Sequence, residues 1–415
     1  MGYFKWAVKY CWYFLILVFI LFNVGLYFPT PLAHSRDALP PRILPQLAGV
    51  KDNLEQGSAA DMQSLFPEGH VFSYLFYGLA WVEVGLRDSD YLNQSLAEAK
   101  WALEFVDAPE SFAPFPDDLP PDHGMFYASW RAHLLAGIVL LEQGQDAQRR
   151  DRLRSECDQI ANTLETSSTP FPASYHNSSW PCDTVPGIHA MAVHDHVTGE
   201  AHFSEAIENW KTRARVGLDP ATGLIAHLTD PRNGSVVLPA RATSQTVILR
   251  LLPDIDPELA DEHYHKFREH FFTTFIGLPS VLEYSAHSDG GGGDVDSGPL
   301  IFGRSLSATC MTIGLAQIYG DDRWAEGIAV TGEVVGMPYG WTESRKYAFG
   351  LVPIGDAIVA YAYTARPWIH EDMVARTKHP LTAFWRWPMH GVLLVLIFGT
   401  VVVRRFFRTR KQESQ

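Results

Sequence analysis

The sequence predicts an all-α protein: an (α/α)6 barrel with one small β-hairpin, flanked by an N-terminal and a C-terminal transmembrane helix. Three observations predict this fold class. Apolar residues recur at i, i+3, i+4 and i+7 in about eleven segments. These segments occur in pairs joined by short turns such as GLRDSDY, EQGQD and VTGEA, which is typical of αα-hairpins. Each end of the chain carries an apolar run that suggests a membrane helix.

The N-terminal run lies between Tyr10 and Phe28 and contains no charged residue, whereas Lys5 and Lys9 precede it. About 20 apolar residues suffice to cross a bilayer. A signal peptide has a shorter apolar core and a cleavage site with small residues, and PTPLAHS is a poor site. We therefore expect an uncleaved membrane anchor at 1–34, followed by a Pro-rich linker at 35–60.

The middle of the chain, residues 61–368, is expected to form the barrel domain. No residue signature repeats between its helical hairpins, which disfavours the alternative of an open solenoid. GLIAHL and GSVVLPA flank TDPRN and predict a β-hairpin at 223–240. The expected helices are 71–84 with 91–105, 128–143 with 147–164, 185–198 with 202–216, 244–252 with 257–275, 304–319 with 322–335, and 352–363, which would begin a sixth pair.

The C-terminal run, GVLLVLIFGTVVV at 391–403, is followed by the basic sequence RRFFRTRK. Trp385 and Trp387 precede it, as aromatic residues do at a membrane interface. We expect a linker at 369–386, a second transmembrane helix at 387–404 and a basic tail at 405–415; the alternative is a buried or re-entrant helix. The basic residues outside both runs place both termini in the cytoplasm and the barrel outside it, where no ATP or nicotinamide pool is available.

Composition and residue spacing exclude several functions. The net charge of −14 argues against nucleic acid as a partner, because binding phosphates requires a basic surface. The four cysteines are too dispersed for a disulfide framework, although one pair could form. No cofactor and no metal are expected: the spacing of His189, His194 and His196 in HAMAVHDH is not a standard zinc arrangement, and we expect helix-surface histidines instead.

Carboxylates stand out in the polar, aromatic-rich stretches that directly precede the expected inner helices. Such stretches would meet at one end of a barrel. Two carboxyls across a pocket are what acid–base cleavage of a glycosidic or other activated C–O bond requires. We expect Asp183, Asp294 and Asp296 to be catalytic and Glu283 to assist them.

Two of these stretches have alternative interpretations. GGGGDVDSGPLIFG contains Asp294 and Asp296, but the sixth and twelfth positions counted from Asp294 are Pro299 and Ser305, which excludes an EF-hand loop. Asp296 or Ser297 could instead cap a helix. In SSWPCDT, a helix N-terminus would stabilise a thiolate or a carboxylate, so Cys182 is also a catalytic candidate. The alternatives are a small buried cysteine and a capping Asp183.

Other side chains in these stretches are expected to bind substrate. Arg131 could hold a carboxylate or a sugar hydroxyl, or could form a structural ion pair. In LPARATSQ, the alternative is a capping Ser244 with an exposed Arg241. The candidate substrate-binding residues are Glu68, His70, Tyr127, Arg131, His133, Trp180, Arg241, Ser244 and Gln245.

Several segments resemble the linalool dehydratase/isomerase family over residues 60–365, roughly. The segments are HVFSYLFYGLAWVEVGL, SSWPCDTVPGIHAMAVHDHVTG, GLDPATGLIAHLTDPRNGSVV, TSQTVILRLLPDIDPELADEHYHKFREHF, DVDSGPLIFGRSLSATCMTIGLAQIYGD and RKYAFGLVPIGDAIVAYAYT. The resemblance implies an (α/α)6 barrel that works without a cofactor. It also implies dehydration and isomerisation of a tertiary alcohol by acid–base residues and two cysteines in an apolar pocket.

The chain departs from this pattern at the positions that carry the family's chemistry. Cys182 matches one cysteine, but FPASYHNSS, where the other would lie, contains none. The family's tyrosines correspond to about His70 and Thr243, and its histidine falls near Arg131 or His133. Arg, Ser, Gln and carboxylates replace an apolar lining, which favours a hydroxylated substrate because buried polar groups need partners.

Three functions follow as hypotheses. The first is an acid–base enzyme that hydrolyses a glycoside or eliminates across a C–O bond of a small molecule or glycan. The second is a terpene-alcohol dehydratase/isomerase with Cys182 and His133 or His70 in the proton relay. The third is a non-catalytic barrel that binds envelope glycan or lipid.

Overall fold

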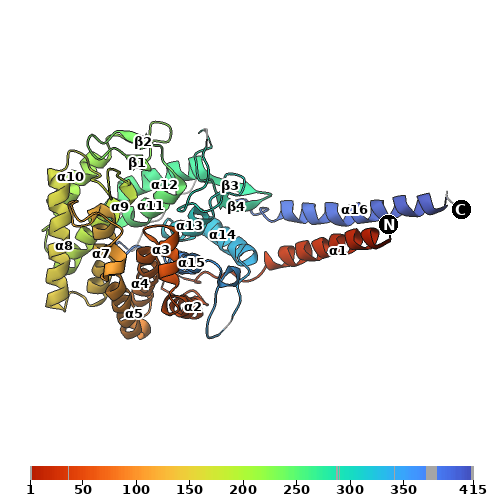
Figure 1. Ribbon diagram of the computed structural model, residues 1–415, viewed down its shortest axis with the longest axis horizontal. Coiled ribbons are helices and arrows are strands. Elements are labelled where there is room, and N and C mark those ends of the chain that lie inside the picture. The colour runs from red at the N-terminus through yellow and green to blue at the C-terminus, as the bar shows by residue number, and fades with distance from the viewer. Residues whose placement is uncertain are drawn as a thin grey trace.

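The computed structural model describes residues 2–35, 37–286, 288, 290–340, 342–370 and 381–412. In these residues the chain is mainly helical, with sixteen α-helices and two short β-hairpins. A body of packed helices carries a two-helix stalk that projects from one side (Figure 1). The prediction of a mainly helical protein is thus confirmed.

Six helices of the body share one feature, which is that most of their residues are buried. α4 and α7, for example, are apolar on every side, as expected of helices enclosed by other helices. Each of the six packs against the next, and the last packs against the first (Figure 1). They are α4 (Gly69–Arg87), α7 (Gly124–Leu141), α9 (Pro181–Thr198), α11 (Ala242–Ile255), α13 (Leu306–Ile318) and α15 (Pro353–Tyr363).

A second set of helices is amphipathic and packs outside the first. α10 and α12, for example, bury one apolar stripe and expose charged residues on the other face. Each follows the inner helix on which it packs, so the predicted helical pairs are present. The set comprises α5 (Leu92–Val106), α8 (Ala147–Thr166), α10 (Ser204–Ala214), α12 (Pro257–Phe271) and α14 (Asp322–Val335).

The segment predicted to be a linker at 35–60 instead contains structure. α2 (Ile43–Glu55) packs against α15, and α3 (Ser58–Leu65) packs against α4. Leu47, Val50 and Leu54 form a buried apolar stripe at helical spacing. The prolines that suggested a linker lie before or within the first turn of α2, where proline is tolerated, so they do not break the helix.

The two hairpins differ in how well the sequence predicted them. β1 (Leu228–Thr229) and β2 (Val236–Leu238) pair within the predicted hairpin at 223–240, which is therefore confirmed. β3 (Phe272–Phe275) and β4 (Leu278–Val281) lie where the end of a helix was predicted, so the helix 257–275 is too long. The turn between them, Ile276–Gly277, has two positive φ angles, a conformation that ends the helix pattern and starts a hairpin.

The stalk consists of α1 (Gly2–Gly25) and α16 (Trp387–Gln412), which run antiparallel with both chain ends at its far tip (Figure 1). Trp12 Nε1 donates to Thr400 Oγ1 at 2.7 Å. Near the body, Asn23 Oδ1 accepts from His390 Nδ1 at 2.5 Å, so the other ring nitrogen accepts from the Tyr27 hydroxyl at 2.6 Å.

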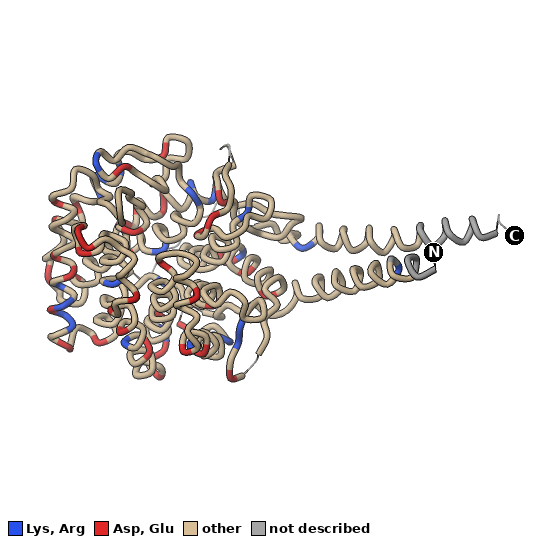
Figure 2. Tube along the Cα trace, in the orientation of Figure 1, with Lys and Arg blue, Asp and Glu red and all other residues tan. Residues whose placement is uncertain are grey.

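The structure supports membrane spans at both ends only weakly. Among the described helices, only α7 has the length and apolarity of a span, and it is a core helix that is 89% buried. The apolar parts of the stalk helices, Lys9–Gly25 and Trp387–Val401, are shorter. Both are uncharged over most of their described length, whereas charges of both signs cover the body (Figure 2). Within the predicted linker 369–386, residues 371–380 lie outside the described residues, as do residues 413–415 of the predicted tail.

Candidate active site

The first part of the candidate site is a group of three carboxyls from separate elements. Asp183 lies in the first turn of α9, Glu68 directly precedes α4, and Asp296 lies in the loop before α13. Asp183 is only 7% exposed. Burial, together with the charges of Glu68 and Asp296, raises the pKa of Asp183 to about 8 despite an opposing hydrogen bond with Ser174. Asp183 is therefore protonated at neutral pH.

Asp296 occupies a different environment from Asp183. Its side chain is exposed, yet protein atoms crowd it closely enough to displace much of its bulk water. This desolvation, with the charges of Asp294 and Glu68, raises the pKa of Asp296 to about 6, while Arg241 opposes the shift. Asp296 is therefore ionised at neutral pH, which gives the group one carboxylic acid and one accessible carboxylate.

Tyr175 joins this group and was not predicted. Its hydroxyl donates a hydrogen bond to Glu68, and its ring stacks on Trp180 with centroids 4.9 Å apart. Both rings are half-buried and lie in the segment that leads into α9. The pKa of Tyr175 is raised by burial and by the charge of Glu68, so the hydroxyl remains a proton donor.

Cys182 lies beside Asp183, with Sγ 3.9 Å from Oδ1. The side chain is partly buried and packs against the hydrophobic core. Burial and the charge of Asp183 raise the pKa of Cys182 well above its ordinary value, although a hydrogen bond with Ser244 opposes this. The rise in pKa from desolvation thus outweighs the lowering expected from the helix N-terminus, and Cys182 is a neutral thiol. All four cysteines are free, so no disulfide pair forms.

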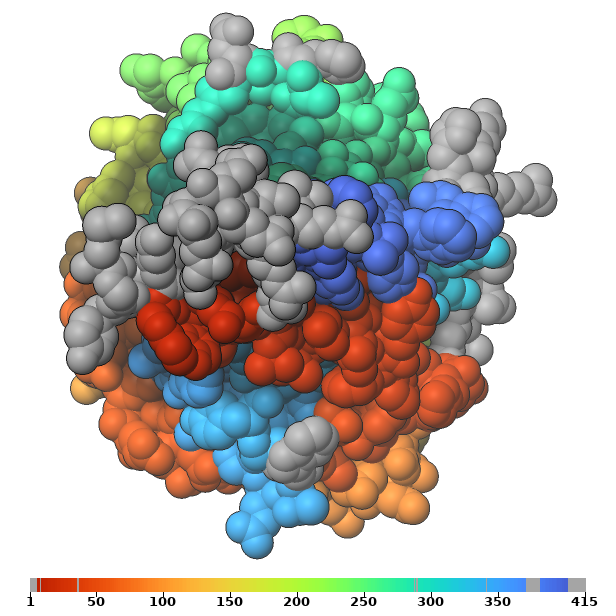
Figure 3. Space-filling view, turned by 90° about the vertical axis from the view of Figure 1, so that its right-hand side faces the viewer, coloured from red at the N-terminus to blue at the C-terminus, as the bar shows by residue number. Residues whose placement is uncertain are grey.

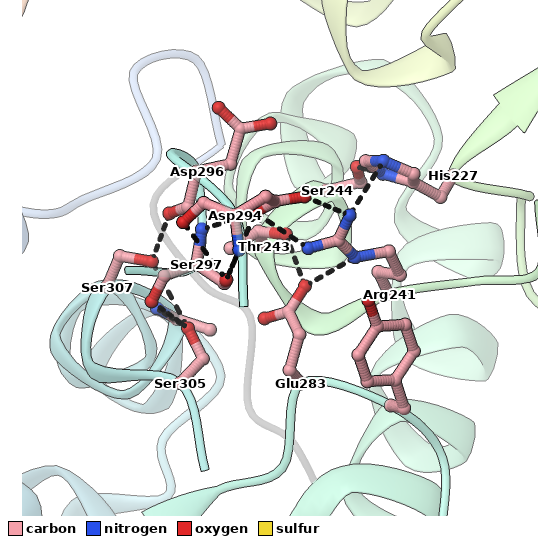
Figure 4. A network of polar contacts seen from close by, with 12 residues as sticks. His227, Arg241, Thr243, Ser244, Glu283, Asp294, Asp296, Ser297, Ser305 and Ser307 are labelled. Carbon is pink, nitrogen blue, oxygen red and sulfur yellow. Dashed lines mark hydrogen bonds and ion pairs between the residues drawn. The ribbon is translucent and has the colours of Figure 1, made fainter. Parts of the chain in front are cut away.

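The second part of the site is an ion network around Arg241 (Figure 4). Arg241 directly precedes α11 and is only 4% exposed, which contradicts the alternative of an exposed arginine. Its Nε donates to Glu283 Oε1 at 2.8 Å, and its two Nη atoms donate to the Asp294 carboxylate at 2.5 and 3.0 Å. Glu283 is fully buried and also accepts from Thr243 Oγ1 at 2.7 Å. Arg241 and Glu283 therefore compensate each other's charge in the interior.

Asp294 fastens the glycine-rich loop to this network. Burial alone would raise the pKa of Asp294, but hydrogen bonds from Arg241 and Ser297 outweigh it and hold the pKa below its ordinary value. Ser297 N donates to Asp294 Oδ1 at 3.0 Å, which closes a turn within the loop. Gly298 has a φ of 65°, and a Cβ at Gly293 would lie 2.4 Å from its carbonyl oxygen, so this turn requires glycine at both positions.

In the same turn, the side chain of Asp296 does not join the Arg241 network. Ser307 Oγ donates to the backbone oxygen of Asp296, and the Asp296 carboxylate points away from Arg241 (Figure 4). Ser305, not Asp296 or Ser297, caps α13, since its Oγ accepts from Ala308 N at 3.2 Å. Neither aspartate in the loop is a helix cap: Asp294 holds the loop, and the charge of Asp296 acts on Asp183 at the start of α9.

His227 and Ser244 complete the network and are held tightly. His227 Nδ1 and Ser244 Oγ lie 2.5 Å apart, and His227 Nε2 lies 3.3 Å from Arg241 Nη1. Burial and the charge of Arg241 lower the pKa of His227 to about 3, so this histidine is neutral. Ser244 does not cap α11, which has no side-chain cap.

Five of the expected substrate-binding residues make structural contacts with residues other than Glu68, Asp183 and Asp296. The Tyr127 hydroxyl donates to the Val106 carbonyl at 2.9 Å, Arg131 pairs with Glu156 at 3.2 Å, and Gln245 Nε2 donates to the Ile225 carbonyl at 2.7 Å. His70 is buried, with Nδ1 2.8 Å from Ser111 Oγ. His133 is fully buried in a separate network.

That separate network joins α7, α9 and α11 to the segment that follows α15. His189 Nδ1 lies 3.2 Å from His133 Nδ1, and its Nε2 lies 3.1 Å from Asp254 Oδ2. Asp254 also accepts from the backbone nitrogens of Trp368, Ile369 and His370, at 2.6 to 3.1 Å. The prediction of helix-surface histidines is therefore wrong for His189 and for His194, which is also buried; only His196 is exposed.

The sequence contained a weak signal for the residues that were missed. Tyr175 lies in FPASYHNSSW, a stretch expected to line the site, but nothing marked it above its neighbours. His227 and Thr243 are polar residues in or beside a hairpin and a helix start, and only the fold brings them to Arg241.

Comparison with known proteins identifies no relative. No protein-family model matches the chain, and a search of curated proteins finds no match. Among the described residues there is no group of three or more His, Cys, Asp or Glu side chains placed to hold a metal ion. The function is therefore argued from the geometry of the site.

Proposed function

We propose that the protein is a membrane-tethered enzyme that uses Asp183 and Asp296 as an acid–base pair on a C–O bond of a hydroxylated substrate. One observation carries the proposal: the pKa values of these two neighbouring carboxyls differ, about 8 for Asp183 and about 6 for Asp296. Carboxyls whose environments separate their pKa values can take opposite roles. Asp183 would protonate the leaving oxygen, and Asp296 would accept a proton from water or from the substrate carbon.

The proposed scaffold is an (α/α)6 barrel. The cyclic order of packing, from α4 through α7, α9, α11 and α13 to α15 and back to α4, supports it. So does the second set of helices outside these six. In such a barrel the N-terminal ends of the inner helices meet at one opening, which accounts for the convergence of Glu68, Asp183 and Asp296.

A polar substrate fits the side chains around the acid–base pair. The half-buried Tyr175 and Trp180 rings offer an apolar face, and Glu68 and Asp296 offer hydrogen-bond acceptors. Apolar walls with a few polar groups are typical of small-molecule sites. A sugar or another polyol would satisfy both, so glycoside hydrolysis and water elimination are the two reactions we propose to test.

The tether is proposed from the stalk. α1 and α16 are apolar, uncharged over most of their described length and antiparallel. Lys5 and Lys9 precede the first apolar run, and five basic residues follow the second, so both basic clusters lie toward the far tip. The positive-inside rule then places both termini in the cytoplasm and the body outside it.

A terpene-alcohol dehydratase/isomerase is the second candidate. The resemblance to that family supports it, as does the position of the partly exposed Cys182 beside Asp183. The neutral state of the thiol argues against a nucleophilic role but permits proton donation. His133 would take no part, because it is fully buried in the other network.

The two candidates are separated by matched variants of the full-length protein. Hydrolysis of a panel of nitrophenyl glycosides and loss of water from tertiary alcohols would be measured for wild type, Asp296→Asn and Cys182→Ala. We expect Asp296→Asn to abolish turnover and Cys182→Ala to retain most of it. A lethal Cys182→Ala with an active Asp296→Asn would support the dehydratase/isomerase instead. If neither change affects turnover of a substrate that wild type converts, the acid–base proposal fails. If wild type converts no substrate of either kind, a binding role becomes the better explanation.

A further inference from the structure

The face of the body from which the stalk emerges carries two loops, one on each side of the stalk. The first comprises the β3–β4 turn and the adjacent turn at 301–304. A Cβ at Gly277 in the β3–β4 turn would lie 2.1 Å from the Trp385 carbonyl oxygen, so this turn touches the chain just before α16. The second is the segment 336–352, which follows α14. Figure 3, which looks at the face that bears the stalk, shows both loops flanking its base.

Both loops expose large apolar side chains at their tips. We call the following set the stalk-base surface: Ile276, Phe302, Met337, Tyr339, Phe349 and Leu351. Phe302 is 73% exposed, Phe349 63% and Leu351 78%. Monomeric soluble proteins rarely gather such residues on one face, and when they do the face usually binds a protein or a membrane.

The backbone at these tips is strained. Ile276, Phe302, Met337 and Phe349 all have φ between 43° and 58°, a region that non-glycine residues rarely occupy. The rings are also supported from behind: Phe302 stacks on Phe275 at 4.9 Å, and Phe349 stacks on Tyr339 at 6.3 Å. Strain kept at exposed apolar residues points to a contact made outside the chain.

The stalk identifies that contact. If α1 and α16 enter a bilayer, the face around their base must lie against its surface. Arg386 supports this placement: its guanidinium lies 4.1 Å from the Trp385 ring and 5.4 Å from the Tyr27 ring, an arrangement of aromatic and basic groups typical of the headgroup region. Arg304 similarly lies 5.1 Å from the Phe275 ring, beside the tip that carries Phe302.

We propose that the stalk-base surface inserts its apolar tips into the lipid leaflet, so that the body rests on the membrane rather than standing away from it. This inference depends on the proposed tether. It also connects the membrane to the candidate site, because one segment carries both Asp296 and Phe302. Lipid contact at Phe302 would hold the loop that positions Asp296.

The test uses the full-length protein in phosphatidylcholine vesicles with isotopically labelled lipid. A photo-crosslinking phenylalanine analogue is placed at position 302, 349, 14 or 216 in four separate variants. Phe14 is an exposed stalk residue and reports on the tether. Val216 is 75% exposed and is the negative control. It follows α10, which lies on the side of the body opposite the stalk (Figure 1).

We expect lipid adducts at positions 302, 349 and 14, and none at 216. Adducts at 14 without adducts at 302 and 349 would overturn the proposed surface and leave the tether intact. Protein–protein adducts at 302 and 349 in place of lipid adducts would also overturn it, in favour of a second copy as the partner. Absence of lipid adducts at 14, 302 and 349 alike would overturn the tether and the surface together.

Discussion

At the scale of single residues, the state of Asp183 decides whether the site can supply a proton. Burial and two neighbouring carboxylates raise its pKa to about 8, so the acid is neutral at physiological pH. Asp183→Asn keeps the shape and the neutral charge but cannot donate this proton. General acid catalysis contributes about 10²- to 10⁴-fold, so we expect kcat to fall by that factor. Circular dichroism should show unchanged helix content, and an active Asp183→Asn protein would contradict the assignment.

The pH dependence of catalysis follows from the two carboxyls together. Below about pH 6 Asp296 becomes protonated and could not act as the proposed base, and above about pH 8 Asp183 loses the proton that the proposed acid would donate. We therefore expect a bell-shaped profile of kcat/KM with its maximum between these values. Replacing Asp296 with Glu should move the acidic limb and leave the alkaline limb in place. A profile without an alkaline limb would argue against Asp183 as the acid.

The same shift makes Asp183 costly for stability. Its pKa rises from 3.8 in the unfolded chain to about 8 in the folded protein, so the folded state binds more protons between these values. The free energy of unfolding should therefore decrease as the pH rises from 4 to 8. Asp183→Asn removes this dependence. We expect its melting temperature to exceed that of wild type by an amount that grows with pH up to 8, as measured by calorimetry at several pH values.

At the scale of elements, the glycine-rich loop depends on the Asp294–Arg241 ion pair. Asp294→Asn weakens the charge-assisted contacts that hold the loop, and Asp296 then loses its fixed position. We expect faster hydrogen exchange of the backbone amides at 290–300 and a fall in kcat of about tenfold, since mispositioning costs less than removing a reacting group. Asp230→Asn is the matched control, because Asp230 pairs with the exposed Arg232 at the surface. Equal exchange in the two variants would show that Asp294 does not hold the loop.

The elements also show what the sequence could predict. Apolar periodicity identified the inner and outer helices, because each helix buries a face whose pattern is local. It failed at 272–281, where apolar residues fit both a helix and a strand and only the Ile276–Gly277 turn decides. It also failed at α2, where prolines at the helix start concealed the stripe of Leu47, Val50 and Leu54.

For the candidate site, the positions of the carboxylates along the chain predicted that they share a location, but not which residues they contact there. Glu68 directly precedes α4, Asp183 lies in the first turn of α9, and Asp296 lies in the loop that leads to α13, so a shared location followed from the order of the elements. Tyr175 and the Arg241–Glu283 pair depend on contacts between distant segments. Arg131 and His133, in contrast, lie further along α7, where they face Glu156 and His189 rather than the site.

At the scale of the whole molecule, one buried ion pair joins three inner helices. Arg250 of α11 donates to both oxygens of Glu83 of α4, at 2.7 and 2.8 Å, and its guanidinium stacks on Tyr361 of α15. Glu83 also accepts from Thr364 and from Trp368 Nε1, at 2.8 and 3.2 Å. Glu83 and Arg250 are no more than 3% exposed, so neither charge is solvated once its partner is lost.

Removing one partner of this ion pair should therefore lower the free energy of unfolding far more than removing both. Glu83→Ala leaves Arg250 as an unpaired buried cation, and we expect the free energy of unfolding to fall by about 3–5 kcal/mol. Combining Glu83→Leu with Arg250→Met removes both charges and fills similar volumes, so most of this loss should be recovered. Recovery will be incomplete, because Trp368 Nε1 loses its acceptor and Thr364 keeps only its backbone acceptors. Glu208→Ala, which breaks the exposed pair with Lys211, should cost less than about 1 kcal/mol. The unfolding free energies of all three variants are measured by urea denaturation followed by circular dichroism. A double variant as unstable as Glu83→Ala would contradict this expectation. It would show that the ion pair itself stabilises the packing of the three helices, and that the loss in Glu83→Ala does not come from an unpaired buried charge.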